Sequence, residues 1–191
     1  SRSFSVRAAH CRGASRVRAR GPAPHGEEPH RARVVLGPPG GAPVLKQMVD
    51  AYARLGRSVL AVQEVPADQV RRYGIVAGQP AGERLIDIER IVEKPVPDQA
   101  PSRMDVAGRY VLSPGIFDEI REQTPGAGGE IQLTDAIARL MTKEAVYAYQ
   151  YKGKRYDCGS KEGFLQATVE LALQHPQMGA GFRDYLKSLA L

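Results

Sequence analysis

Residues 90–95 (Arg-Ile-Val-Glu-Lys-Pro) contain the side chains in this sequence that are most clearly able to bind a polar, charged ligand. The run is typical of a strand that ends in a carboxylate, an ammonium and a proline. Glu93 can accept hydrogen bonds from sugar hydroxyls, and Lys94 can meet a phosphate as a point charge. A solvated strand end is the ordinary alternative, so a binding role depends on what accompanies these residues.

Two glycines lie inside predicted strands. Glycine weakens strand pairing and often marks the close approach of a ligand or of another backbone. Gly74 in the run Tyr-Gly-Ile-Val-Ala and Gly108 in the run Val-Ala-Gly-Arg-Tyr have this context. A packing glycine or a β-bulge is the alternative interpretation at both positions.

Two further segments could contact a phosphorylated ligand. Residues 126–130 (Gly-Ala-Gly-Gly-Glu) could present backbone N–H groups to an anion, but they lack the spacing and the lysine of a P-loop, which favours a plain flexible loop. Asp157 lies in a predicted loop, residues 153–159, just before a helix. Its carboxylate could bind Mg²⁺ together with substrate phosphates, or it could simply be an acid near a helix N-terminus.

Covalent catalysis is disfavoured by the remaining residue types. Three of the four histidines precede residue 34, and His175 ends a predicted helix. The sequence contains no Gly-x-Ser-x-Gly, and Asp157 beside Cys158 does not favour a thiolate. Metal-assisted phosphoryl chemistry, which depends on positioning, stays open.

Alternating strand and helix patterns must position these side chains, and they predict a layered α/β domain. Helix 44–55 has an apolar face and ends at Gly56. Ser113 is expected to cap a helix that starts at Pro114. The alternation of residues 84–94 breaks near Arg90, which predicts a bulge, and residues 79–82 are expected to turn the chain. The predicted strands are 34–37, 58–65, 73–77, 84–94, 106–112 and 145–151, and the other helical segments are 67–72, 133–141, 161–175 (with Phe164, Thr168, Leu171 and Ala172 inward) and 182–189.

The net charge of +6 comes from the first 33 residues. They hold eight of the 27 basic residues and two of the 21 acidic ones, so residues 34–191 are neutral with 19 of each. We therefore expect residues 1–33 to be a separate, disordered basic segment and residues 34–191 to form the sugar-phosphate-binding part of a domain. Because residues 34–191 have no net charge, they create no overall positive potential that would attract nucleic acid. Nucleic acid is therefore not an expected partner.

Three hypotheses account for residues 1–33, which show no period of 2 or 3.6. The segment is a basic interaction tail, a targeting segment, or sequence that does not belong to the fold. Arginine without lysine, with alanine, glycine and proline, is what GC-rich DNA gives when it is translated out of frame. We favour this last hypothesis.

The two cysteines, Cys11 and Cys158, give neither a disulfide framework nor a zinc spacing. No run of about 18 apolar residues indicates a membrane span. The expected location is the cytoplasm, with no membrane contact.

Six ordered blocks resemble one family, the bacterial UTP–glucose-1-phosphate uridylyltransferases. The blocks are PVLKQM (43–48), YGIV (73–76), IVEKP (91–95), GRYVL (108–112), PGAGGEIQLTDA (125–136) and KGKRYDCG (152–159). The similarity runs from about residue 43 to residue 191 and covers the C-terminal portion of that family. It implies a truncated sugar-nucleotidyltransferase (Rossmann-like) α/β fold, with a mixed, mainly parallel sheet flanked by helices.

The resemblance also implies a reaction and a site. UTP and glucose 1-phosphate would give UDP-glucose and pyrophosphate, with Mg²⁺, in a homo-oligomer. By position, Gly74 would contact the sugar through its backbone, Glu93 would bind sugar hydroxyls, Lys94 would bind the phosphate and take part in catalysis, and Gly108 would also bind substrate. Asp157 matches a metal-ligating aspartate.

The sequence departs from the family in two places. The family's nucleotide-binding half, with its glycine-rich loop, has no counterpart in residues 1–33, and Pro38-Pro39 stands where the family has an aspartate pair. We therefore expect the chain to be inactive by itself. The alternative expectation is a remnant that binds sugar phosphate or docks on other subunits without catalysis.

Overall fold

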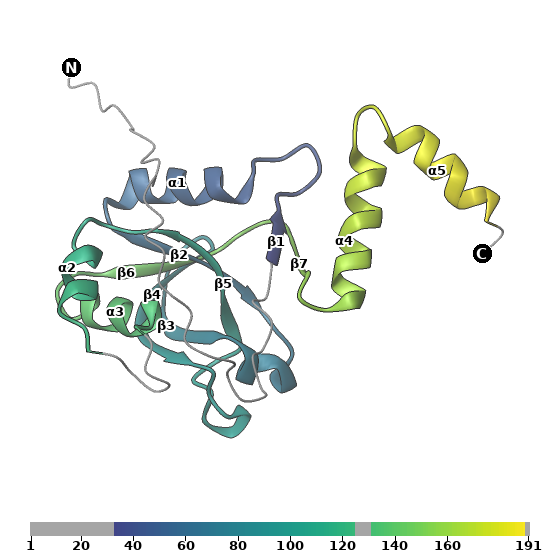
Figure 1. The fold of residues 1–191 in the computed structure, drawn as a ribbon. Helices are drawn as coiled ribbons and strands as arrows, with labels where there is room; N and C mark the ends of the chain where they lie inside the picture. Colours follow the sequence, from purple (N-terminus) through teal and green to yellow (C-terminus); the bar gives the residue numbers. More distant parts are fainter. Residues whose placement is uncertain (1–32, 125–130, 190–191) are drawn as a thin grey trace, which may run out of the picture.

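The computed structural model describes residues 33–124 and 131–189. Its body is a set of five strands that close on themselves in the order β2-β5-β3-β4-β6, and a small separate sheet pairs β1 with β7. Figure 1 shows α1 lying across one side of this body and α2 with α3 at one end. The strands are β1 (Arg33–Leu36), β2 (Ser58–Glu64), β3 (Gly74–Gly82), β4 (Leu85–Glu93), β5 (Met104–Val111), β6 (Val146–Gln150) and β7 (Lys154–Asp157).

Helices cover the outside of the strands. The α-helices are α1 (Val44–Leu55), α2 (Ile116–Arg121), α3 (Leu133–Leu140), α4 (Lys161–Gln174) and α5 (Gly179–Ser188), and the short 3₁₀ helices are Ala67–Arg72 and Pro97–Gln99. Within the described residues, no helix is both long and apolar enough to cross a membrane. The predictions for residues 1–32 and for the glycine-rich loop at 125–130 fall outside the described residues. Arg33, assigned above to the leading segment, is the first residue of β1.

The α/β class and the mixed sheet are confirmed, but the expectation of a mainly parallel sheet is wrong. Only β2 and β6 pair in parallel among the described strands, and every other pair is antiparallel. For β3 and β4 the reason is their short connection. A two-residue turn between β3 and β4 permits only antiparallel neighbours, whereas parallel neighbours need a long crossover.

Helix α1 forms as its sequence predicts. Its apolar residues recur at helical spacing, and Val44, Met48 and Ala51 are buried against the strands. Gly56 follows with φ +62°, and its N–H bonds to the carbonyl of Tyr52 at 2.8 Å. Glycine adopts this left-handed conformation without a Cβ penalty, which explains why the helix ends there.

The β3–β4 hairpin contains the predicted bulge, but its turn lies at a different position from the predicted turn. Ala77 pairs with Arg90 and Gly78 pairs with Ile88, so one extra residue, Glu89, sits in β4 beside the predicted position. β3 continues through residues 79–82, where a turn was predicted, and the chain reverses at residues 83–84 instead. Arg84 there has φ +60°. Its side chain donates to the carbonyl of Gln150 at 2.6 Å, a contact from a distant strand that local sequence does not reveal.

Two other local predictions are wrong. Ser113 does not cap α2, because its hydroxyl donates to Glu144 at 2.6 Å and the helix starts at Ile116. The predicted loop 153–159 contains β7, which forms because it pairs with β1.

Helix α4 begins as predicted but buries a different face. Ser160 caps it by accepting a hydrogen bond from the N–H of Gly163 at 3.0 Å. The buried residues are Gly163 and Ala167, whereas the predicted inward residues Phe164 and Leu171 are exposed. The cause is close packing, because a Cβ at Gly163 would lie 2.2 Å from the carbonyl oxygen of Asp157.

The core has two main apolar clusters. The larger one joins the strands to α2 and α3 and includes Leu60, Val76, Ile116 and Ile137. The second lies under α1 and centres on Met48. These clusters hold β3, β4 and β5 in place, and Gly74 and Glu93 are end residues of β3 and β4.

We predict that Gly78→Ala destabilises the protein by about 2 kcal/mol or more, because overpacking at a fixed backbone is costly. A Cβ at Gly78 would lie 1.8 Å from the backbone oxygen of Asp87. The matched control is Gly181→Ala in α5, where nothing lies within 4 Å of the added Cβ. That change should stabilise by about 0.5 kcal/mol. Urea unfolding measures both, and equal effects would contradict the bulge geometry.

Candidate functional site

The hairpin brings Gly74 and Glu93 together. Gly74 is the first residue of β3, and it pairs directly with Glu93, the last residue of β4. A Cβ at Gly74 would lie 3.0 Å from Oε2 of Glu93 and 3.8 Å from Oγ1 of Thr134. The missing side chain thus leaves room for the carboxylate beside the strand backbone.

Thr134 orients the Glu93 carboxylate. Its hydroxyl, in the first turn of α3, donates to Oε2 of Glu93 at 2.8 Å. No local sequence pattern marks Thr134 as a site residue, although it lies in the block at 125–136. Glu93 itself is exposed, so its other oxygen can accept further hydrogen bonds.

Lys94 has an unusual backbone conformation. Its φ is +45°, in the left-handed region that non-glycine residues rarely adopt. Its N–H donates to the carbonyl of Tyr73 at 3.0 Å, which fixes the turn after β4. The side chain is exposed. In the described part of the chain the ammonium has no ion-pair partner, so it is available to an anion.

Gly108 occupies a bulge in β5. Leu60 pairs with Tyr110 and Val62 pairs with Val106, so three residues of β5 face a single residue of β2. Gly108 has φ +70°, and a Cβ there would lie 3.8 Å from a guanidinium nitrogen of Arg33. The bulge interpretation therefore describes its backbone, and its binding role remains a prediction.

Tyr110, two residues along β5, is coupled electrostatically to the same region. Burial raises the pKa of the Tyr110 phenol, and the negative charge of Glu93 raises that pKa further. The phenol therefore stays protonated and can act as a hydrogen-bond donor. Sequence reasoning missed this residue, because nothing local marks its proximity to Glu93.

Asp157 ends β7 and approaches the start of β3. It pairs with Arg33 of β1, and its Oδ2 lies 3.7 Å from a guanidinium nitrogen of Arg72. Its Oδ1 accepts a hydrogen bond from the N–H of Gly159 at 3.3 Å. Within residues 33–124 and 131–189, no three histidine, cysteine, aspartate or glutamate side chains gather to hold a metal. Asp157 therefore offers a single carboxylate.

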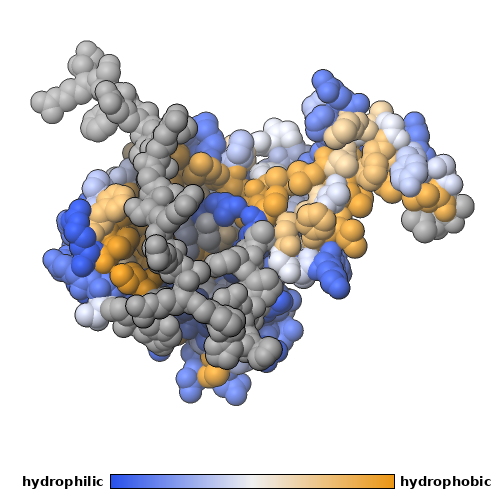
Figure 2. All heavy atoms as spheres, in the orientation of Figure 1, coloured by the Kyte–Doolittle hydropathy of each residue, from blue (hydrophilic) through white to orange (hydrophobic). Residues whose placement is uncertain are grey.

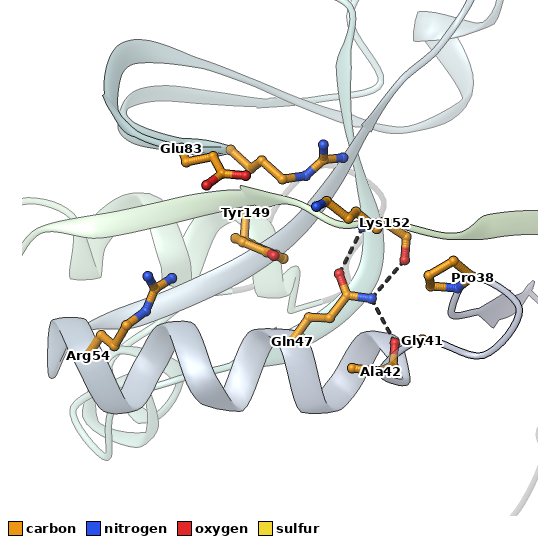
Figure 3. Close-up of a pocket in the computed structure, with 9 residues that line it drawn as sticks. Pro38, Gly41, Ala42, Gln47, Arg54, Glu83, Tyr149 and Lys152 are labelled. Carbon is orange, nitrogen blue, oxygen red and sulfur yellow. Dashed lines mark hydrogen bonds between the residues drawn. The ribbon is translucent and has the colours of Figure 1, made fainter.

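A separate cavity of about 360 Å³ lies at the opposite end of β3 and β4 (Figure 3). At about 3.3 Å per residue, these nine-residue strands separate it from Gly74 and Glu93 by about 25 Å. Gln47 beside it bonds to the backbone of Ala42 and Lys152. The cavity lining is Pro38, Gly41, Ala42, Gln47, Arg54, Glu83, Arg84, Tyr149 and Lys152, which includes none of the predicted site residues.

Comparison with known proteins gives the class of enzyme. Residues 42–174 match the family model described as Nucleotidyl transferase, and the chain belongs to that family. Its predicted membership in the transferases is confirmed.

The relatives narrow the class. The chain is 45% identical over 147 residues to the UTP–glucose-1-phosphate uridylyltransferase of Staphylococcus epidermidis, and 46% identical over 148 residues to that of Streptococcus pneumoniae. These alignments cover 77% of this chain and 51% and 50% of the relatives, so the chain spans about half the length of the curated relatives it matches.

A solved structure agrees with the sequence relatives. The structure of a UDP-glucose pyrophosphorylase complexed with UDP-glucose superimposes with a TM-score of 0.70 at 38% identity. The match covers 75% of this chain and 54% of that one. The resemblance inferred from the six sequence blocks is thereby confirmed.

The site geometry predicts coupling between Gly74 and Thr134. In the wild type, Gly74→Ala should push the Glu93 carboxylate away from the Thr134 hydroxyl and cost its hydrogen bond, about 1 kcal/mol. In a Thr134→Val background that bond is already absent, so the same change should cost less. Urea unfolding of the double-mutant cycle measures the difference. Gly181→Ala with Thr134→Val is the control and should be additive; additivity at Gly74 as well would contradict the geometry.

Proposed function

We propose that this chain binds glucose 1-phosphate as the sugar-phosphate side of a UTP–glucose-1-phosphate uridylyltransferase. The observation that carries the proposal is the cluster at the open ends of β3 and β4. There, Gly74 pairs with Glu93 across the two strands, and Lys94 follows Glu93. Thr134 orients the Glu93 carboxylate, and the exposed Lys94 ammonium has no ion pair among the described residues. The similarity to uridylyltransferases supports the choice of ligand.

Each group suits one part of the ligand. Glu93 is an acceptor for two sugar hydroxyls, and Thr134 holds one of its oxygens in place. Gly74 would contact the sugar through its backbone, beside the Glu93 carboxylate that lies next to it. Lys94 meets the phosphate with up to three N–H donors. Gly108 would contribute backbone from the neighbouring strand.

In the proposed reaction, a phosphate oxygen of glucose 1-phosphate attacks the α-phosphorus of UTP. The new P–O bond forms as the bond from the α-phosphorus to the bridging oxygen of pyrophosphate breaks. Two anions must approach each other in line, so charge neutralisation and orientation supply most of the barrier reduction. Lys94 would lower the repulsion by holding the attacking phosphate and would take part in catalysis in that sense.

The carboxylate of Asp157 is a hard oxygen donor of the type that Mg²⁺ prefers, so this residue would suit the metal. Mg²⁺ in phosphoryl-transfer sites commonly takes one or two carboxylates, with phosphates and waters as the other ligands. The metal supplies charge neutralisation at the phosphates when bound. Asp157 would hold it with its carboxylate, which also lies 3.7 Å from a guanidinium nitrogen of Arg72.

We further propose that turnover by this chain is low. Pro38 and Pro39 offer no carboxylate where the resemblance implies an aspartate pair. In the β1–β7 register, Leu36 lies opposite Lys154, three residues from Asp157, and Pro38 lines the distant cavity. The proposed setting is cytoplasmic, which the free thiol of Cys158 supports.

A second candidate function is docking on another copy of the chain through α4 and α5. These helices project from the body (Figure 1), and hydrophobic side chains are visible on their surface (Figure 2). Phe164 and Tyr185 are each 57% exposed and Leu165 is 61% exposed. Apolar groups gathered this way typically mark an interaction surface. The neutral net charge of residues 34–191 places no general repulsion between two copies.

We predict that Lys94→Ala weakens glucose 1-phosphate binding at least about tenfold, because a charge-assisted contact to phosphate is lost. Titration calorimetry on the full chain measures the affinity. Lys152→Ala, which removes an exposed lysine at the distant cavity, is the matched control and should bind like the wild type.

Equal heats for the wild type and Lys94→Ala, or no heat for either protein, would contradict the proposed site. A coupled pyrophosphate-release assay with UTP and glucose 1-phosphate separately measures turnover. A rate near that of a full-length relative would refute the proposal of low turnover without affecting the binding result.

For the docking candidate, we predict concentration-dependent self-association of the wild type that Phe164→Lys abolishes. A buried charge without a partner is costly at an apolar interface. Light scattering after size exclusion measures the mass. The control is Phe117→Lys on α2, which introduces the same charge at a residue that is 62% exposed at the other end of the body. A monomeric wild type, or equal loss in both variants, would exclude α4 as the docking surface.

A further inference from the structure

A buried ion pair joins the small sheet to the five-stranded body. Asp105 on β5 is fully buried, and Arg155 on β7 donates to its Oδ2 from a side chain that is only 10% exposed. The two residues are 50 positions apart and lie on strands that belong to different sheets. The pair therefore fixes β7 relative to β5.

The same guanidinium packs on Tyr73. The central carbon of the Arg155 guanidinium lies 4.6 Å from the centre of the Tyr73 ring, and that of Arg33 lies 4.7 Å from it. Tyr73 is 3% exposed, so the ring is held in a cage of two cations and the core. Its carbonyl accepts the hydrogen bond from the N–H of Lys94 at 3.0 Å. Arg155 is thus connected to the left-handed turn that presents Lys94.

The connection also reaches Asp157. Arg155 and Asp157 are two residues apart on β7 and so point to the same face of that strand. Arg72, which precedes Tyr73, lies 3.7 Å from Asp157. One cluster therefore contacts both the segment that carries Lys94 and the strand that carries Asp157.

Stability alone is a poor explanation for this pair. Burial raises the pKa of Asp105, and the positive charges of Arg155 and Arg33 oppose that rise. Oδ1 of Asp105 is buried with no hydrogen-bond donor among the described residues. Well-packed apolar residues commonly replace such pairs at no loss of stability, so the presence of the pair is weak evidence for a stabilising role.

We propose that Asp105 and Arg155 are positioning residues for the phosphate-binding turn. Their ion pair holds the Tyr73 ring, and the Tyr73 carbonyl holds the backbone of Lys94, so that the ammonium projects beside Glu93. The pair also sets the separation between Lys94 and Asp157. The structural part stands on contacts within the chain, and the functional part rests on the proposed binding of glucose 1-phosphate.

Amide hydrogen exchange at Lys94 tests the structural part directly. Asp105→Asn should speed exchange at Lys94 about tenfold relative to the core amide of Val62, because the Tyr73 carbonyl loses its fixed position. Arg155→Lys keeps the charge but not the planar group that covers the ring, and should speed it about threefold. The double variant Asp105→Asn, Arg155→Gln should be no worse than Asp105→Asn, since the two residues act as a unit.

The control is Glu119→Gln. Glu119 is also a buried carboxylate, paired with Arg139 and Lys143 between α2 and α3. Its loss should lower the melting temperature while leaving the ratio of the Lys94 rate to the Val62 rate within twofold of the wild type. An unchanged ratio in Asp105→Asn, or the same rise in Glu119→Gln, would overturn the positioning role.

Calorimetry with glucose 1-phosphate tests the functional part. Asp105→Asn should weaken binding about tenfold and Arg155→Lys about threefold, with Glu119→Gln unchanged. If exchange at Lys94 rises but no protein, wild type included, binds glucose 1-phosphate, the positioning role holds and the proposed function fails. If the wild type binds and Asp105→Asn binds equally well, the proposed function holds and the positioning of the ligand site by this pair is overturned.

Discussion

The antiparallel register of β3 and β4 is the constraint on which the candidate site depends. It sets Gly74 opposite Glu93 and leaves the N–H of Lys94 opposite the carbonyl of Tyr73. Side chains alternate along a strand, so a shift of one residue would turn Glu93 to the other face of the sheet. Glu89 is the extra residue in β4, so the pairing register of β3 and β4 shifts by one residue at that point in the hairpin. The bulge therefore determines which face of β4 carries the carboxylate.

A strand pair alone does not orient a carboxylate, and α3 supplies the missing contact. Thr134 stands in the first turn of α3, and the buried side of this helix packs into the apolar core through Ala136, Ile137 and Leu140. That packing fixes the distance from the helix to β4, and the hydrogen bond from Thr134 to Glu93 follows from it. The site is thus assembled from three strands and one helix that the core holds in register.

Sequence predicted the features that depend on neighbours in the chain. Gly56 ends α1 because a left-handed residue is needed there, and the break in alternation near Arg90 marks the bulge. The features that depend on distant partners could not be predicted this way. The turn at Arg84 is held by Gln150, and β7 exists because β1 pairs with it. Likewise Gly74, Glu93 and Lys94 stand out locally, whereas the roles of Thr134, Tyr110 and Arg155 come from contacts across the fold.

The contrast between Lys94 and Arg155 shows how the charges are distributed. Arg155 is nearly buried, and its guanidinium is occupied by Asp105 and Tyr73. Lys94 is exposed, and its left-handed backbone costs about 1–2 kcal/mol for a residue with a Cβ. A strained residue persists only where its surroundings constrain it, and the backbone hydrogen bond to the caged tyrosine is one such constraint. The buried charges thus stabilise the turn that exposes Lys94, and we propose that this exposed charge meets a phosphate.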